Sequence, residues 1–132
     1  MKKDITARED IVLLVDSFYH KIKKDDLIGF IFTDIARVNF EKHLPVMYDF
    51  FENMLFYTGT YSGNPMELHK QLDRLYPLTK LHFHRWTHLF TTTVDELFNG
   101  ETAELAKQRA LSIAQIMQIK IAEDTSSPGK IK

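Results

Sequence analysis

The histidine at position 69 lies in a segment that is too short to hold its own helix. It follows the turn signal Asn64-Pro65 and precedes Pro77, and these signals limit how far a helix can run. A helix of this length is marginal in water unless something else anchors it. A bond from the His69 imidazole to a metal would provide that anchor. On these grounds alone, surface and core positions also remain open for His69.

A second pair of histidines, His84 and His88, is four residues apart, which places both on one face of a helix. Such a pair can chelate a metal ion. The two flank Arg85 and Thr87, away from the aromatic stripe of the same helix, so the pattern favours a solvated face. A metal site that uses this pair stays as an alternative.

Three further polar side chains stand on apolar helical stripes. Tyr19 falls on the stripe of the first helix, where a buried phenol needs a partner, either a backbone carbonyl or a group in a cavity. His43 heads the stripe of the second helix, as a capping or surface residue or as a residue that gates a pocket. Trp86 lies on an inward face, where the pattern alone predicts a core residue.

Many common chemistries are excluded by the sequence. The chain has no cysteine, so disulfides, thiolate metal sites and cysteine nucleophiles are absent. The paired Glu-x-x-His motifs of di-iron bundles, the His-Glu-x-x-His zinc signature, phosphate-binding glycine loops and the nucleophile elbow do not occur. No carboxylate pair stands out as an acid/base couple.

The composition describes one globular domain. The 132 residues are 44% hydrophobic, and the net charge of −1 gives no broad basic surface for nucleic acid or anionic lipid. The charged start and the lack of an apolar run of roughly 20 residues predict a soluble, cytoplasmic protein without a membrane partner. No exposed apolar stripe is evident, so we expect a monomer more than an oligomer.

Hydrophobic periodicity predicts an all-α protein, because strand alternation never persists. We expect a single domain over residues 1–122 and a frayed tail over 123–132. The first helix should follow a capping box at Thr6–Glu9 and end at 23–26. The second should begin near His43, with Pro45 in its first turn and an inward stripe at steps of four and three. That stripe comprises His43, Met47, Phe50, Met54 and Tyr57. The last two helices are expected at about 81–98 and 102–122.

Five stretches in order and at matching spacing carry a resemblance to a known family. They are "SFYHKI", "FEKHLPVMYDFF", "YSGNPMELHKQL", "HFHRWTHLF" and "AKQRALSIAQIM". Together they resemble the group III truncated haemoglobins of the globin superfamily, from about Asp10 to Ile121. The resemblance implies a truncated globin fold, a 2-on-2 helical sandwich around haem b.

The resemblance also implies roles for individual residues. His69 would be the proximal ligand of the haem iron. Tyr19 would be the distal tyrosine that holds bound O₂, with His43 at the distal entrance and Trp86 lining the distal pocket. Cofactor contacts would come from the following set: Phe32, His43, Met47, Phe50, Phe51, His69, Trp86, Ile113 and Met117.

The function implied is that of a haem protein that binds O₂, NO or other diatomic ligands. Tight retention of O₂ by a phenol donor suits chemistry on O₂ or nitric oxide, such as NO detoxification or peroxide and redox reactions, better than bulk oxygen transport. The activity implied is nitric oxide dioxygenase-like or peroxidase-like, and an unidentified reductase is a candidate partner. The alternative is a helical sensor or interaction module, either haem-based or haem-free.

Overall fold

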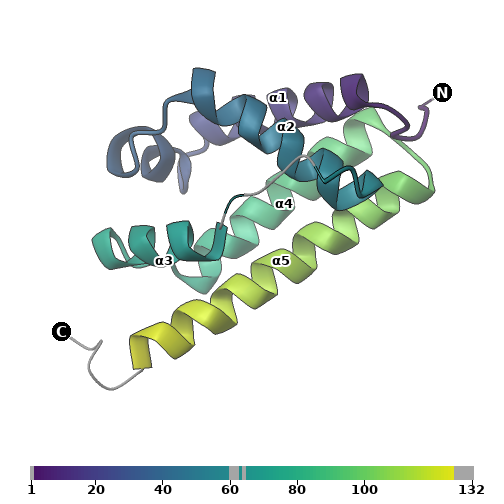
Figure 1. Ribbon diagram of the computed structural model, residues 1–132. Helices are drawn as coiled ribbons and strands as arrows, with labels where there is room; N and C mark the ends of the chain where they lie inside the picture. Colours follow the sequence, from purple (N-terminus) through teal and green to yellow (C-terminus); the bar gives the residue numbers. More distant parts are fainter. Residues whose placement is uncertain (1, 60–62, 64, 127–132) are drawn as a thin grey trace.

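The structure, a computed structural model, describes residues 2–59, 63 and 65–126. Within these ranges the chain is helical and contains no strand (Figure 1). The elements are α1 (Arg8–Lys24), the π-helical turn η1 (Ile31–Ile35), α2 (Phe40–Phe56), α3 (Pro65–Leu75), α4 (Lys80–Leu97) and α5 (Glu101–Ser126). The prediction of an all-α chain with a short helix around His69 is confirmed.

The helices form two layers of two. α1 packs against α2 and against α4, α4 packs against α5, and α2 also contacts α5. Figure 1 shows α1 and α2 in the upper layer and α4 and α5 in the lower one. α3 stands outside this sandwich and packs mainly against α5. No helix in the described part of the chain is long and apolar enough to span a membrane.

Aromatic rings fill the centre of the sandwich. Phe18 of α1, Phe51 of α2 and Phe90 of α4 are fully buried. The ring centroids of Phe18 and Phe90 lie 5.1 Å apart edge to face, and those of Phe51 and Phe90 lie 5.2 Å apart in a stack. Because α1, α2 and α4 each contribute one large ring, this cluster fixes how the two layers meet.

The start of α1 differs from the predicted capping box. The helix begins at Arg8, so Ala7 is the capping residue, and alanine has no side-chain acceptor. The Asp10 carboxylate takes over and accepts the backbone N–H groups of Thr6 and Ala7 at 2.9 and 3.2 Å. The predicted box at Thr6–Glu9 is therefore wrong by one residue.

The second helix begins three residues earlier than predicted. The side chain of Asn39 accepts the backbone N–H of Lys42 at 3.4 Å, which starts α2 at Phe40. His43 consequently lies inside the helix, and Pro45 lies beyond its first turn. At the other end, Tyr57 is 73% exposed in a left-handed conformation, so its predicted place on the inward stripe is wrong.

The last helix is longer than predicted and is capped from a distance. α5 continues to Ser126 instead of ending near Ala122, so residues 123–126 of the predicted tail are helical. Residues 127–132 lie outside the described residues. At the other end, Asp4 accepts the backbone N–H groups of Thr102 and Ala103 at 3.0 and 2.8 Å, which joins the N-terminal segment to α5.

Candidate functional site

Tyr19 and His43 meet between α1 and α2. Tyr19 is only 3% exposed, and its hydroxyl oxygen lies 3.3 Å from Nε2 of His43. Three phenylalanines pack edge-on against the phenol ring: the ring centroid of Phe18 lies 5.2 Å away, and those of Phe32 and Phe40 lie 6.0 Å away. The structure thus brings Tyr19, His43 and Phe32 together between α1 and α2.

The surroundings set the protonation of this pair. Burial raises the pKa of Tyr19, so its hydroxyl keeps its proton and can donate a hydrogen bond. Burial lowers the pKa of His43, and the nearby positive charge of His69 lowers it further. A neutral imidazole offers one donor and one acceptor nitrogen, so it can serve as the partner of the phenol.

His69 lies on α3 and is half-buried. Its effect on the pKa of His43 shows that the two imidazoles, on α3 and on α2, are within electrostatic range of each other. Along α2 the inward stripe that starts at His43 stays only half-buried at Met47, Phe50 and Met54. This helix therefore presents an apolar face that the protein core does not fully cover.

Trp86 of α4 contacts both the central aromatic rings and a second apolar cluster that includes residues of α5. It is half-buried, stacks on Phe90 with ring centroids 5.9 Å apart, and meets Phe18 edge-on at 5.5 Å. Within the described part of the chain its indole N–H has no hydrogen-bond partner. Ile113 and Met117 of α5 belong to a second cluster against which Trp86 also packs. Phe51, by contrast, is a fully buried core ring next to Phe50.

Two residues at this site were missed from the sequence. Phe40 contacts His43 (centroids 6.4 Å apart) as well as Tyr19, and Nζ of Lys23 lies 4.3 Å from the centre of the Phe40 ring. Phe40 precedes His43 by three residues and so shares its helical face. That signal was lost because Pro45 was taken to mark the first turn of α2.

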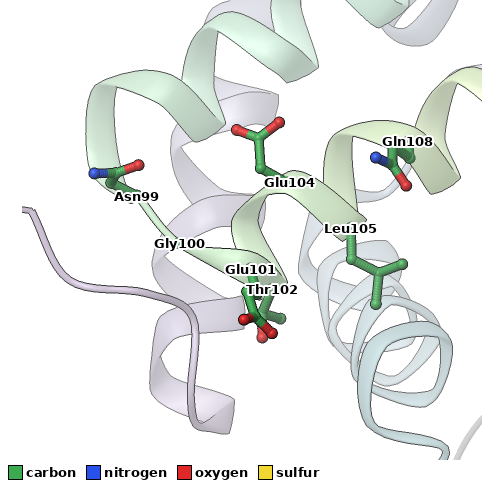
Figure 2. Close-up of a pocket in the computed structure, with 7 residues that line it drawn as sticks. All are labelled: Asn99, Gly100, Glu101, Thr102, Glu104, Leu105 and Gln108. Carbon is green, nitrogen blue, oxygen red and sulfur yellow. The ribbon is translucent and has the colours of Figure 1, made fainter.

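Other parts of the molecule offer weaker candidates. His84 and His88 are both exposed, as predicted, and no group of three potential metal ligands occurs among the described residues. An open hollow of about 680 Å³ lies at the corner between α4 and α5. Figure 2 shows the residues that line it, among them Asn99 and Glu104. None of its lining residues belongs to the Tyr19–His43–His69 site.

Comparison with known proteins identifies the family. The model of the bacterial-like globin family matches residues 3–121. The chain belongs to this family. The group 3 truncated haemoglobin of Campylobacter jejuni is 31% identical over 121 residues, which is 89% of this chain and 93% of that protein. The crystal structure of the group III truncated haemoglobin from the same organism superposes with a TM-score of 0.80 at 30% identity, covering 92% of this chain and 95% of the other.

This chain is therefore a truncated haemoglobin of group 3 with the truncated globin fold, as its sequence motifs implied. Membership of the globin family implies haem as cofactor and diatomic gases such as O₂ as ligands. The residues at the site fit such a group chemically. His69 on α3 would ligate the iron of this cofactor, and Tyr19 and His43 would offer hydrogen-bonding groups. The half-buried apolar stripe on α2 would cover part of the macrocycle.

Proposed function

We propose that this globin holds haem b through His69 and binds O₂ on the opposite side under the hydroxyl of Tyr19. The observation that carries the proposal is the buried phenol of Tyr19, whose hydroxyl oxygen lies 3.3 Å from Nε2 of His43, together with the half-buried His69 on α3. Two sides of one site are thus occupied by a candidate ligand and by a candidate hydrogen-bond donor.

Haem, when bound, would supply an iron that can take a ligand from the protein and a diatomic gas. His69 would be the protein ligand. On the other side Tyr19 would donate its hydroxyl hydrogen to the gas molecule, and the low polarity around the phenol strengthens that bond relative to water. The indole N–H of Trp86, a donor without an acceptor role, would add a second bond.

His43 would tune this arrangement. When no gas is present, its Nε2 is the partner of the Tyr19 hydroxyl. A gas molecule would compete with that imidazole for the phenol hydrogen, so part of the binding free energy is spent on breaking the existing bond. Phe32 and Phe40 limit the movement of the phenol ring from two sides, which keeps the hydroxyl aimed at one place.

Strong hydrogen bonding to bound O₂ slows its release, and slow release is unsuited to oxygen delivery. We propose a role in O₂ and nitric oxide chemistry, either NO detoxification or a peroxidase-like reaction, with an electron-donating reductase as partner. The cofactor would carry the redox change, and the protein would contribute orientation and hydrogen bonding. If the protein were instead a sensor or interaction module, it would have the same fold but would not consume O₂ or nitric oxide.

Optical spectra of the ferrous protein, before and after O₂ addition, test the proposal. We expect a porphyrin band that shifts on O₂ binding. In His69→Gly the ferrous spectrum should change and haem retention should fall, and added imidazole should restore both because it can replace the lost side chain. His84→Ala is the matched control and should leave the spectrum unchanged.

A colourless protein from haem-supplied cells would overturn haem binding and support the haem-free module. A normal spectrum in His69→Gly would remove His69 as the ligand. Turnover of NO in the presence of O₂ and a reductant then separates the chemical role from sensing, because a sensor would bind the gas without consuming it.

A further inference from the structure

Two pairs of side chains face each other where α1 meets the start of α2. Tyr19 and Lys23 are four residues apart on α1. Phe40 and His43 are three residues apart on α2, so the members of each pair share one face of their helix. Nε2 of His43 lies 3.3 Å from the hydroxyl oxygen of Tyr19. Nζ of Lys23 lies 4.3 Å from the centre of the Phe40 ring, so a cation and a ring make a second contact beside the polar one.

Phe40 contacts both members of the polar pair. Its ring meets the Tyr19 ring edge-on with centroids 6.0 Å apart, and it meets the His43 ring edge-on with centroids 6.4 Å apart. Both separations fall in the range in which aromatic rings attract each other. Lys23 is exposed, Phe40 is half-buried and Tyr19 is buried. The contact between Lys23 and Phe40 is therefore the outer one, and the contact between Tyr19 and His43 is the inner one.

The ammonium of Lys23 restrains the Phe40 ring. A distance of 4.3 Å lies well inside the limit of about 6 Å for attraction between a cation and a ring face. Lys21 on the same helix pairs with Glu96 at 2.6 Å, whereas Lys23 has no carboxylate partner among the residues that the structure describes. Because the attraction acts on the face of the ring, it fixes the orientation of Phe40 as well as its position.

The first turn of α2 requires such a restraint. The N–H groups that begin a helix have no partner within the helix. The cap of α2 is a long hydrogen bond, from the N–H of Lys42 to the side chain of Asn39 at 3.4 Å. Phe40 is the first residue of α2, and His43 lies at the end of the same turn. A contact that holds Phe40 in place therefore also holds His43.

We propose that Phe40, held by Lys23, is a positioning residue that keeps His43 on the hydroxyl of Tyr19. When the ring is released, the first turn of α2 gains freedom, and the contact between Tyr19 and His43 opens more often. The consequence for gas binding rests on the proposed function, in which a gas molecule competes with His43 for the phenol hydrogen. The positioning of His43 by itself does not depend on haem.

The exchange of the Tyr19 hydroxyl hydrogen with water, measured by NMR on the full-length chain without haem, tests the positioning. A buried, bonded hydrogen exchanges only when its contact opens, so the rate reports how often this happens. Phe40→Leu should speed exchange roughly tenfold, because it removes both ring contacts. Lys23→Met keeps the stem without the charge and should speed it about two- to fivefold.

Two further variants separate this role from a general loss of packing. Lys23→Arg should exchange like the unmodified protein, because a guanidinium also binds ring faces. Lys24→Met, at the exposed neighbouring lysine, is the matched control and should leave the rate unchanged. Exchange in Lys23→Met no faster than in Lys24→Met would overturn the inference, and so would Lys23→Arg exchanging as fast as Lys23→Met. If Phe40→Leu does not fold, Lys23→Met still decides, since it leaves the aromatic rings in place.

Infrared spectra of CO bound to the ferrous, haem-supplied protein test the consequence for the gas site. The stretching frequency of bound CO responds to hydrogen-bond donors near it. We expect one main band in the unmodified protein and in Lys23→Arg, and a second band in Lys23→Met, where His43 leaves the phenol for part of the time. Identical spectra in all three would overturn the link to gas binding. A protein that shows no CO band at all would instead overturn the proposed function, and the exchange test would still decide the positioning of His43.

Discussion

The hydroxyl of Tyr19 is the chemical group on which the site depends. Burial keeps it protonated, and the neutral imidazole of His43 is its partner at 3.3 Å. Neither group carries a charge that would need solvation inside the protein. A phenol that is buried, protonated and already oriented can donate to a gas molecule without first being desolvated, which is why this one residue should control how long O₂ stays.

Replacing Tyr19 with Phe should speed O₂ dissociation at least tenfold. Tenfold corresponds to about 1.4 kcal/mol, the size of one hydrogen bond made in a buried place. Stopped-flow displacement of O₂ by CO measures the rate. Tyr57→Phe is the control, since that phenol is 73% exposed on the far end of α2. An unchanged rate in Tyr19→Phe would remove the phenol from the proposed mechanism.

Among the elements, α5 is capped at its start by a residue that lies almost a hundred positions earlier in the chain. Asp4 accepts N–H groups from Thr102, Ala103 and its own neighbour Ile5. The approach is close because Gly100, at φ +148°, has no side chain: a Cβ there would lie 2.4 Å from Cγ of Asp4. The N-terminal segment is therefore part of the α4–α5 corner, and it fixes where the longest helix begins.

The acid dependence of stability should reveal this cap. Burial alone would raise the pKa of Asp4, but the backbone N–H groups of Thr102, Ala103 and Ile5 outweigh it and lower the pKa below 3.8. A lowered pKa in the folded state means that the stabilisation is present above about pH 4 and is lost as the pH falls below it.

We expect Asp4→Ala to lower the free energy of unfolding by about 1 to 2 kcal/mol at pH 7. The difference from the unmodified protein should shrink as the pH falls below 4, where urea unfolding monitored by circular dichroism can follow it. Asp4→Asn keeps one acceptor, so its loss should be smaller and should vary less with pH. A difference that stays constant down to pH 3 would contradict the assignment of the cap to the ionised carboxylate.

In the molecule as a whole, α3 is the helix that the rest of the protein supports least. The four long helices form the sandwich, whereas the eleven residues Pro65–Leu75 pack mainly against α5. A helix of this length contributes little stability by itself. In the proposed function the bond from His69 to haem iron supplies the missing support, so haem binding and the order of α3 are coupled.

Hydrogen exchange should show this coupling. In the haem-free protein the amides of α3 should exchange much faster than those of α1 and α4, because local opening costs little there. Haem should slow exchange in α3 at least tenfold and raise the melting temperature of the protein. In His69→Gly the slowing in α3 should be largely lost. Equal protection of α3 with and without haem would show that the fold alone holds this helix.

The local sequence determined the helices of this protein and the family to which it belongs. The 3.6-residue spacing of apolar side chains fixed the number and type of helices, and proline and glycine limited the short helix and the α4–α5 corner. The inward positions of Tyr19 and Trp86 followed from the same spacing. Five motifs in order sufficed to indicate the globin family, which the comparisons confirm.

Tertiary structure decided the rest, because it depends on residues far apart in the chain. Nothing local to Thr102 shows that Asp4 caps its helix, and Pro45 suggested a start for α2 that the Asn39 cap moved to Phe40. The contact between Tyr19 and His43 requires the packing angle of α1 against α2. The exposure of Leu111, Ile116 and Ile119 on α5 became visible only once the other helices were seen to cover the opposite side of this helix, since a helical period marks two faces but does not say which one meets solvent.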